Sequence, residues 1–409
     1  MTTIAVVGTG LAGVRAAEAL RTEGYDGHLV LVGEETAQPY DRPPLSKQVL
    51  LGKCESQDIA LTDEDLCAML DAEWLLGARA TALDPASRAL VLADGRSLHA
   101  DGVVVATGAR ARTLPGMPQL KGVHTLRTLD DAHRLREDLA RPGQIVVVGG
   151  GFIGAEVASS ARALGHEVTI VEYEQKPLLR QLGPQAAGIL CRLHTDHGVA
   201  LVTGVGVTGL LGEDRVRAVA LADGRFLPAD VVVVGVGAVP NTEWLTGSGV
   251  TCDNGVLTDE WCRTTVPEVV AAGDVAAYRC RSGRLRIEHW TNARDMPVIA
   301  AGSLLATLRG LDPKAQPIHD PLPYVWSDQY GVHLQIAGRP GVDDVLELVS
   351  GSFDDSFAAV YRRDDEISGV LAVDSPREFG RLRRDLRSAW SSRRVADSFN
   401  LSEEHRHVS

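Results

Sequence analysis

An α/β protein is predicted from this sequence, with two parallel-sheet domains and a small C-terminal α+β domain. Three observations support the prediction. An apolar, β-branched run at residues 4–7 leads into a glycine-rich turn and a helix-forming stretch. Residues 144–172 repeat that order of strand, glycines, helix and second strand. From about residue 316 the pattern changes to alternating residues with glycine turns, which is typical of antiparallel strands.

The composition indicates a globular protein of more than one domain. A chain of 409 residues is too long for one core, so two or three domains are expected. The chain is 44% hydrophobic and 23% charged, and no apolar run approaches the roughly 20 residues that a membrane-spanning helix needs. The N-terminus enters a strand without a preceding basic segment, so we expect no signal peptide and a cytoplasmic location.

Charge and cysteine usage exclude several classes of protein. The net charge of −13 argues against nucleic acid as a partner, although a local basic face for an acidic protein remains open. The cysteines never form Cys-x-x-Cys, which argues against a disulfide framework, a zinc knuckle and a bound iron–sulfur cluster, and no metal site is expected. Buried or incidental thiols are predicted at all six positions, which are 54, 67, 191, 252, 262 and 280.

The first glycine-rich turn carries the spacing Gly8-x-Gly10-x-x-Gly13. Glycines at this spacing let the backbone approach a pyrophosphate, and the following helix N-terminus supplies N–H groups and a positive dipole. The second apolar run ends at Glu34, where a carboxylate can accept hydrogen bonds from a ribose. Glycine turns also serve ordinary packing. Strand, glycines, helix, strand and acid in this order, however, indicate a nucleotide-binding unit.

The second copy has its glycines at Gly149, Gly151 and Gly154 and its acid at Glu172. One such unit binds one dinucleotide, so two copies imply two dinucleotides held by separate domains. A duplication with a dead second site is the less favoured alternative, because all the glycines and the acid are intact.

Other segments give weaker signals. The prolines of residues 39–47 exclude a regular helix, and the cations of this loop, Arg42 and Lys47, are either solvated or in contact with a phosphate or flavin. By itself, Asp274 is a turn former or a helix cap. Helices are predicted at residues 63–70, after residue 292 with an interruption at Pro297, and at 376–390.

The chain as a whole resembles the FAD-dependent, NADH-using ferredoxin reductases that serve bacterial oxygenases, within the larger flavoprotein fold with two Rossmann-like dinucleotide-binding domains. The motifs are GTGLAG, PYDRPPLSK, ATGA, VVGGGFIGAE, GVGAVPN, AAGDVA, EHWTNA and PYVWSDQYG. The expected domains are a discontinuous FAD domain, an NAD domain, a C-terminal α+β domain and a flexible tail, at residues 1–111 with 239–317, 112–238, 318–390 and 391–409 respectively.

This resemblance implies an FAD site around the first glycine turn. Lys47 would lie near the isoalloxazine ring, Asp274 would bond the ribityl chain, and Trp290 and Trp326 would border the ring. The implied FAD residues are Gly8, Gly10, Leu11, Ala12, Gly13, Glu34, Arg42, Lys47, Ala80, Ala106, Thr107, Gly108, Arg127, Gly273, Asp274, Glu288, His289, Trp290 and Trp326. Similar proteins often carry Gln in the helix after Asn292-Ala293, where this chain has residues 294–297 with a proline.

It also implies an NADH site around the second turn, with Glu156 near the nicotinamide. The implied residues are Gly149, Gly151, Phe152, Ile153, Gly154, Glu156, Glu172, Gly235 and Gly237. Glu172 would accept hydrogen bonds from an unphosphorylated ribose, and Glu174 adds negative charge. A 2′-phosphate would be repelled there, so NADH is predicted over NADPH.

The implied reaction passes a hydride from NADH to FAD and then single electrons to an iron–sulfur ferredoxin of the 2Fe–2S or a similar type. That ferredoxin would feed a haem-thiolate monooxygenase or a ring-hydroxylating dioxygenase. No cysteine stands at residues 43–45, which counts against dithiol reductases of the same fold, and Cys54 is expected to be a small buried residue. No residue is predicted to be catalytic by itself, because the flavin mediates the chemistry.

The protein that accepts electrons from the flavin is predicted less directly. A basic cluster is either a landing site for an acidic ferredoxin or a solvated hairpin, and it consists of Arg279, Arg281, Arg284 and Arg286. A rubredoxin reductase has the same architecture and cofactors. An NADH-responsive signalling flavoprotein would need basic targeting segments, which are not visible, and a water-forming NADH oxidase would need a cysteine that this chain lacks.

Overall fold

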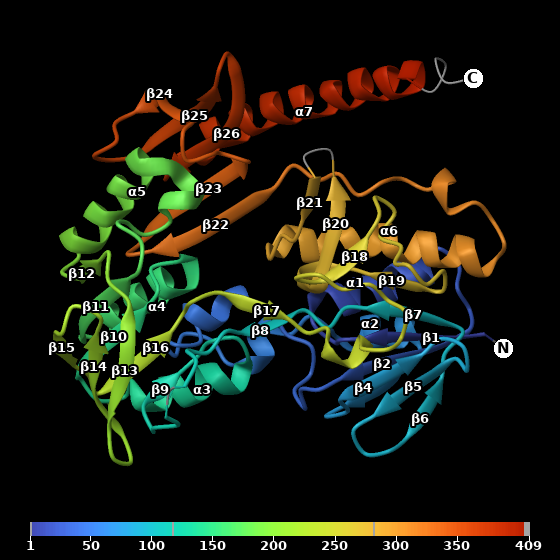
Figure 1. Cartoon of the computed structure of the whole chain (residues 1–409), viewed down its shortest axis with the longest axis horizontal. Helices are drawn as coiled ribbons and strands as arrows, with labels where there is room; N and C mark the ends of the chain where they lie inside the picture. Colours follow the sequence, from blue (N-terminus) through green and yellow to red (C-terminus); the bar gives the residue numbers. More distant parts are fainter. Residues whose placement is uncertain (1, 117, 281–282, 405–409) are drawn as a thin grey trace. The chain divides into compact units, whose positions relative to one another are not determined.

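The computed structural model describes residues 2–116, 118–280 and 283–404, with side chains up to residue 390. The chain forms two compact units (Figure 1). The first unit contains the chain up to Thr113, Thr125–Glu137 and Val236–Pro321. The second unit contains Leu114–His124, Asp138–Gly235 and the chain from Leu322 on. The first unit is therefore discontinuous, because the chain leaves it and returns.

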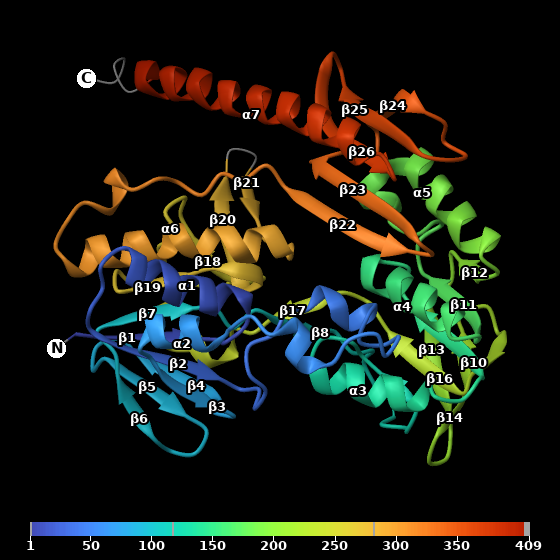
Figure 2. The ribbon, with the colours of Figure 1, turned by 180° about the vertical axis from the view of Figure 1, so that it is seen from behind.

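A five-stranded parallel sheet is the centre of the first unit. Its strands are short, apolar and β-branched, so both faces can be buried. Helices α1 (Leu11–Thr22) and α6 (Trp290–Leu308) pack side by side on it (Figures 1 and 2). In spatial order the strands are β19 (Val269–Ala271), β7 (Gly102–Val105), β1 (Thr3–Val7), β2 (His28–Gly33) and β3 (Glu73–Leu76).

Smaller elements surround this sheet. The antiparallel pairs and ribbons are β4 (Ala80–Asp84) with β5 (Ala89–Leu92) and β6 (Ser97–His99), β8 (Ala109–Ala111) with β17 (Ala238–Pro240), and β20 (Ala276–Cys280) with β21 (Gly283–Leu285); β18 (Val256–Thr258) joins β20 in parallel. The helices are α2 (Glu64–Leu70) and α3 (Leu129–Asp138), with 3-10 turns η1 (Pro43–Ser46), η2 (Ser56–Ile59), η3 (Glu243–Leu245), η4 (Gly273–Val275) and η5 (Pro313–Ala315).

The second unit repeats the parallel architecture. Its main sheet is β12 (Ala200–Thr203), β11 (Glu167–Glu172), β10 (Gln144–Val148), β16 (Val231–Val234) and β9 (Val123–His124), in that order. Helices α4 (Phe152–Ala163) and α5 (Leu179–Asp196) accompany it, and β13 (Val207–Gly212), β14 (Val216–Leu221) and β15 (Phe226–Pro228) form an antiparallel insertion.

An antiparallel sheet completes the second unit. Its order is β22 (Tyr324–Gln329), β23 (Val332–Gly338), β26 (Glu366–Val373), β25 (Phe357–Arg363) and β24 (Val345–Gly351), followed by helix α7 (Pro376–Glu404). Leu182 and Leu190 of α5 share one core with this sheet, and Phe379 and Leu386 of α7 share another with it. The predicted class, two parallel-sheet domains plus an α+β portion, is confirmed.

Two helix predictions need correction. The helix predicted to be interrupted at Pro297 is one helix, α6, that continues through the proline. Pro297 removes one N–H of the ladder, but the buried alanines and leucines that follow hold the helix on the sheet. The helix predicted to end at 390 continues to Glu404, because residues 391–404 contain no glycine or proline to stop it. The end of the predicted tail, residues 405–409, lies outside the described residues.

Across the described part of the chain, no helix combines the length and the apolar character that a bilayer crossing requires.

Candidate functional site

The first glycine turn joins β1 to α1 by very close backbone approach. Gly8 has φ of +115°, and a Cβ built on it would lie 2.1 Å from the carbonyl oxygen of Ala106. A Cβ on Gly13 would lie 1.8 Å from the carbonyl oxygen of Gly8. Only glycine fits at these two positions, and the result is that the ends of β1 and β7 and the start of α1 meet at one place.

The N-terminus of α1 is open at this meeting point. Gly10 is its N-cap residue and supplies no side-chain hydrogen bond to the first turn. No atom lies within 4 Å of a Cβ built on Gly10. The first turn therefore receives no side-chain cap from Gly10 and carries the positive end of the helix dipole, so this cradle is suited to a pyrophosphate.

The second glycine turn repeats this geometry in the other unit. Gly149 has φ of +100°, and a Cβ on Gly154 would lie 2.1 Å from the carbonyl oxygen of Gly149. Gly151 is the uncapped N-cap residue of α4, again with nothing within 4 Å of a built Cβ. The carboxylate of Glu172 accepts from the backbone N–H of Gly150 at 2.8 Å and of Glu174 at 2.9 Å. The predicted acid therefore lies directly beside its glycine turn.

The corresponding acid of the first unit is more exposed. The Glu34 side chain is 67% exposed and lies 3.7 Å from Arg79. The segment that leads to Ala80 is docked along the end of β2, because Ala78 donates its N–H to the Gly33 carbonyl at 2.8 Å. The structure thus brings Glu34 and Ala80, both predicted FAD residues, to the same strand end.

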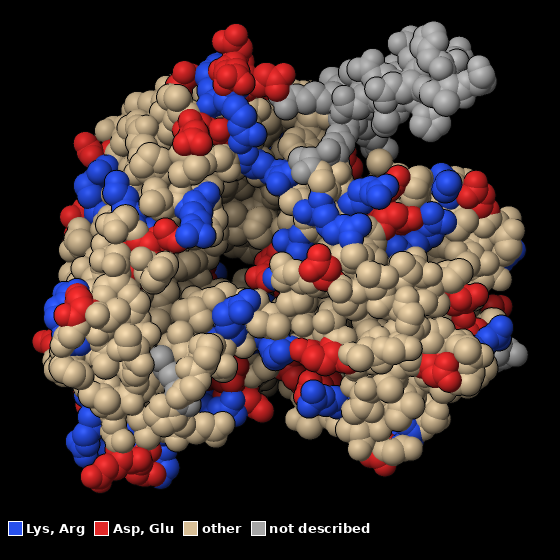
Figure 3. Space-filling view, viewed as in Figure 1, with Lys and Arg blue, Asp and Glu red and all other residues tan. Residues whose placement is uncertain are grey.

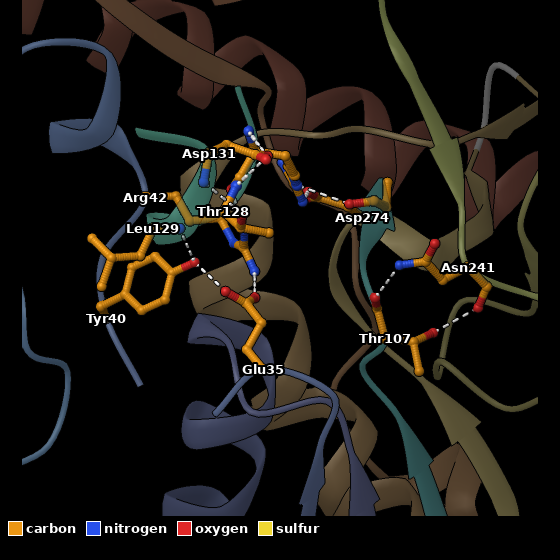
Figure 4. Close-up of polar contacts among 11 residues, drawn as sticks. Glu35, Tyr40, Arg42, Thr107, Thr128, Leu129, Asp131, Asn241 and Asp274 are labelled. Carbon is orange, nitrogen blue, oxygen red and sulfur yellow. Dashed lines mark hydrogen bonds and ion pairs between the residues drawn. The ribbon is translucent and has the colours of Figure 1, made fainter. Parts of the chain in front are cut away.

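Three predicted FAD residues, Arg42, Arg127 and Asp274, meet in one polar network (Figure 4). Arg127 donates from Nη2 to Asp274 Oδ2 at 2.6 Å and from Nε to the Ala109 carbonyl at 2.8 Å. Arg42 donates to the Arg127 carbonyl and, at 2.7 Å, to Glu35. Segments separated by as many as 147 residues in sequence are thereby connected.

A glycine places Asp274 in this network. Gly273 has φ of +77°, and its built Cβ would lie 2.8 Å from the Cβ of Ala12 in α1. The turn η4 therefore lies against the start of α1, and Asp274 follows at once. The Arg286 guanidinium donates to the Asp274 carbonyl at 3.2 Å and pairs with Glu288.

The end of β7 is tied to the returning chain. Thr107 donates its hydroxyl to the Asn241 carbonyl at 2.8 Å, and the Asn241 amide donates to the Thr107 carbonyl at 2.9 Å (Figure 4). Gly108, beside this clamp, has φ of +61°. The clamp fixes the backbone of Thr107 and Gly108, which the resemblance places at FAD.

The loop of residues 39–47 carries a half-buried carboxyl group. Asp41 accepts from the indole N–H of Trp290, the first residue of α6, at 2.7 Å. Burial raises the pKa of Asp41, while the Trp290 hydrogen bond and the nearby Lys47 charge oppose that rise. Trp290 is therefore anchored to the loop that carries Arg42 and Lys47, directly after Glu288 and His289, the N-cap residue of α6.

The remaining predicted residues divide between the units. Trp326 lies in the second unit, with its ring stacked on Tyr324 at 5.8 Å between centroids. Glu156 of α4 is only 4% exposed and accepts from Ser327 at 2.7 Å, whereas the neighbouring Ile153 is exposed. Gly235 packs on the Gly154 backbone, and Gly237, in the first unit, has φ of +95°. Leu11 and Phe152 are the first residues of α1 and α4.

The network also contains residues that the sequence did not single out. Glu35 and Tyr40 hold Arg42, and the Tyr40 hydroxyl accepts from the Leu129 N–H at 2.8 Å. Asp131 accepts from the backbone N–H of Arg127 at 3.0 Å and so holds that residue at the start of α3. The pattern Thr128-x-x-Asp131 resembles a capping box and could have predicted this helix start.

None of the six cysteines takes part in a disulfide bond. Cys262 is fully buried, and burial raises the pKa of its thiol well above the ordinary value. Burial also raises the pKa of Cys54, so neither group favours the reactive thiolate.

Comparisons with known proteins agree with this geometry. The profile of the pyridine nucleotide-disulphide oxidoreductases matches residues 2–296, and the reductase C-terminal profile matches residues 324–400. The ferredoxin reductase component of chlorobenzene dioxygenase from Cupriavidus sp. (strain PS12) is 38% identical over 98% of this chain and 96% of that protein. Putidaredoxin reductase from Pseudomonas putida is 35% identical over 93% of this chain and 90% of that protein.

A solved structure shares the whole architecture. The covalent putidaredoxin reductase–putidaredoxin complex matches with a TM-score of 0.86 and 34% identity, over 94% of this chain and 92% of that chain. Family members bind FAD and NAD(H), for which the two glycine cradles are suited. The chain therefore belongs to the pyridine nucleotide-disulphide oxidoreductases and, among them, to the FAD-dependent ferredoxin reductases of oxygenase systems.

Proposed function

We propose that the protein passes electrons from NADH through FAD to an iron–sulfur ferredoxin that serves an oxygenase. One observation carries the proposal: two dinucleotide cradles occur in one chain, and no cysteine stands at residues 43–45, so a flavin and a nicotinamide can be held without a redox-active cysteine at that position. Bound FAD can accept a hydride and release single electrons, which is the chemistry that this relay requires. The chain's residues bind, orient and charge-balance the two cofactors.

In the first unit, the residues of the polar network are proposed to hold FAD. The open start of α1 would bind the pyrophosphate, and Glu34 the ribose. Asp274, held beside that helix start, would accept from a ribityl hydroxyl, while Arg127 and Arg42 supply positive charge. Lys47 would place a cation near the ring, and Trp290 would border it from the start of α6.

In the second unit, the start of α4 would bind the NADH pyrophosphate, and Glu172 the adenosine ribose. Glu172 is already oriented by two backbone N–H groups, so it can accept ribose hydroxyls without reorganisation. Glu156 would lie at the nicotinamide. Arg180 pairs with Glu174, so its charge is partly committed and offers little to a 2′-phosphate.

A comparison of electron carriers tests the proposed function. The FAD-loaded protein is supplied with NADH and either a [2Fe–2S] ferredoxin or a rubredoxin, and cytochrome c reduction is the readout. We expect rates at least tenfold higher with the ferredoxin. A higher rate with rubredoxin would make the protein a rubredoxin reductase, and reduction of FAD without transfer to either carrier would contradict the proposal.

The ferredoxin is proposed to dock at the β20–β21 ribbon. Arg279 and Arg284 are exposed and directly opposite each other on these strands, where Figure 3 shows basic side chains gathered. Arg286 is only 12% exposed and bonds Glu288, so it contributes less to the surface. Arg281 lies outside the described residues. A basic ribbon on a chain of net charge −13 would attract an acidic partner.

A further inference from the structure

A hydrogen-bonded chain of three side chains ends at Glu156. Glu156 lies in the second turn of α4, just after the second glycine turn, and is 4% exposed. Its Oε1 accepts from the hydroxyl of Ser327, at 2.7 Å. The Ser327 oxygen in turn accepts from the amide nitrogen of Gln329, at 3.0 Å. All three side chains are buried.

Each hydrogen bond in this series has a defined donor and acceptor. The Ser327 hydroxyl donates to Glu156 Oε1, so its proton points at the carboxylate and its lone pairs remain for Gln329. Hydrogen bonds to a charged acceptor are about twice as strong as neutral ones, and here the bond lies away from water. The hydroxyl of Ser327 therefore restricts the rotation of the Glu156 carboxylate.

The alternation of β22 brings both donors to α4. Ser327 and Gln329 are buried on one face of the strand, and α4 packs against this strand. Trp326, directly before Ser327, belongs to the opposite face, where its ring stacks on Tyr324. The C-terminal sheet thus supplies a polar contact to the helix that follows the second glycine turn.

The buried amide of Gln329 is only partly satisfied by hydrogen bonds. Among the described residues its Oε1 finds no hydrogen-bond partner, although the side chain is only 2% exposed. A buried, half-satisfied amide costs stability, so its bond to Ser327 is the contact that accounts for a polar residue here.

A second contact between the same elements provides a control. The backbone N–H of Tyr330 donates to the Ser159 hydroxyl at 2.7 Å. Ser159 lies three residues after Glu156, on the same face of α4. Removing the Ser159 hydroxyl would loosen the β22–β23 hairpin on α4 without touching Glu156.

We infer that Ser327, supported by Gln329, is a positioning residue that orients Glu156 toward the nicotinamide. This inference rests on the proposed function, in which Glu156 lies at the reacting end of NADH. In this inference the C-terminal sheet contributes residues that position a side chain of the NADH site. No contact of Ser327 itself with the substrate is required.

The test is anaerobic stopped-flow reduction of the bound FAD by NADH, with the limiting rate and the half-saturating NADH concentration measured separately. The FAD-loaded variants are Ser327→Ala, Ser327→Thr, Gln329→Ala and Ser159→Ala. We expect the limiting rate to fall about tenfold in S327A and about threefold in Q329A, as loss of a charge-assisted bond implies. S327T keeps the hydroxyl and should stay within about threefold of wild type, and S159A within about twofold.

An S327A limiting rate within twofold of wild type would overturn the inference, and so would an equal fall in S159A, since docking of the hairpin would then explain both. If S327A fails to retain FAD, Q329A is compared with S159A instead. A limiting rate that falls about threefold in Q329A and stays within about twofold in S159A supports the inference, and equal rates in the two variants overturn it. A wild-type protein that NADH reduces normally, beside an unaffected S327A, contradicts the inference alone. A wild-type protein that NADH does not reduce contradicts the proposed function and the inference together.

Discussion

At the scale of single residues, the glycines of each turn perform two different tasks. Gly13 and Gly154 allow a helix to pack against the preceding turn, since any Cβ there would meet a carbonyl oxygen at 1.8 and 2.1 Å respectively. Gly10 and Gly151 have room for a Cβ and ordinary negative φ angles. Their Cβ positions are free in the protein alone, so a side chain there would compete with a ligand and leave the fold intact.

This difference predicts a separation of stability from binding. Gly10→Ala should lower FAD affinity at least tenfold, and Gly151→Ala should raise the Kd of NAD⁺ about tenfold while FAD content stays normal. Without bound cofactor, the melting temperature of both variants should stay close to that of the wild-type apoprotein, because an N-cap glycine contributes modestly. Flavin absorbance, titration with NAD⁺ and thermal unfolding measure the three quantities. Gly154→Ala is the contrasting variant, which should lose stability, and equal unfolding of G151A and G154A would refute the distinction.

Glu172 predicts the choice of nicotinamide cofactor. Its carboxylate is fixed beside the second glycine turn, so a 2′-phosphate would meet a negative charge at close range. We expect NADH to reduce the flavin at least tenfold more efficiently than NADPH, a difference of about 1.4 kcal/mol. Stopped-flow flavin bleaching with each nucleotide measures this ratio, and Glu172→Gln should narrow it. Equal rates for the two nucleotides in the wild type would show the assignment to be wrong.

The sequence predicted residues whose signal is local and missed residues whose role depends on distant partners. Both glycine turns and their acids follow from spacing within about thirty residues, which strand and helix geometry translates directly into position. Glu35 and Asn241 carry no such signal. Asn241 bonds a residue 134 positions away, and Glu35 acts by holding Arg42. Such contacts become visible only when the sheet order is known.

At the scale of elements, buried contacts override local propensity. Pro297 would end an isolated helix, yet α6 continues because its alanine- and leucine-rich side chains are buried with α1 and the sheet. The predicted helix 63–70 formed as expected, since Asp63 caps it and accepts from the Leu66 N–H at 2.8 Å. Helix α7 extends beyond its predicted end at residue 390 for a different reason, because polar residues alone do not stop a helix.

A buried histidine ties the last segment of the first unit to α6 and predicts a pH dependence of stability. His319 lies 2.8 Å from the Asn292 side-chain oxygen, and burial lowers the pKa of His319 to about 4. The unfolded chain binds a proton near pH 6.5 while the folded protein does not, so stability falls as pH decreases from about 6.5 to 4. At pH 5 this group should cost on the order of 2 kcal/mol relative to pH 7.5.

Urea unfolding of the wild type and His319→Gln at pH 7.5 and pH 5 measures the effect. The variant should lose less stability than wild type on acidification, since glutamine can keep the bond to Asn292 without titrating. His28→Gln, which removes an exposed histidine, is the control variant. Burial also lowers the pKa of His194 to about 4, so this histidine in the other unit adds to the loss of stability at acidic pH. Identical pH dependence in wild type and H319Q would refute the assignment.

At the scale of the whole molecule, separate segments of the chain together form the site around the first glycine turn. Residues up to Thr113 supply the glycine turn and the loop of Arg42, and Val236–Pro321 returns with Asp274 and Trp290. The second cradle is formed by the intervening chain. Repetition of the βαβ unit predicts this division, whereas the attachment of the C-terminal sheet to α5 of the second unit depends on apolar contacts that no short motif encodes.

The basic ribbon predicts how a carrier protein associates. Arg284→Glu should lower kcat/KM for ferredoxin about tenfold at low salt, and the difference should shrink at high salt as charges are screened. Reduction of FAD by NADH should be unchanged. Arg96→Glu makes the same charge change on the β5–β6 turn and serves as the control. An R284E protein that reduces ferredoxin like the control would remove this docking assignment.

The central claim is that electrons pass from NADH to ferredoxin through FAD without a thiol. It is tested most directly by reducing the FAD-loaded protein anaerobically with NADH, mixing it with a [2Fe–2S] ferredoxin, and repeating this after alkylation of all accessible cysteines. We expect rapid flavin bleaching, stoichiometric reduction of the ferredoxin, and the same rates after alkylation. A ferredoxin that stays oxidised beside reduced FAD, or transfer that alkylation abolishes, would contradict it.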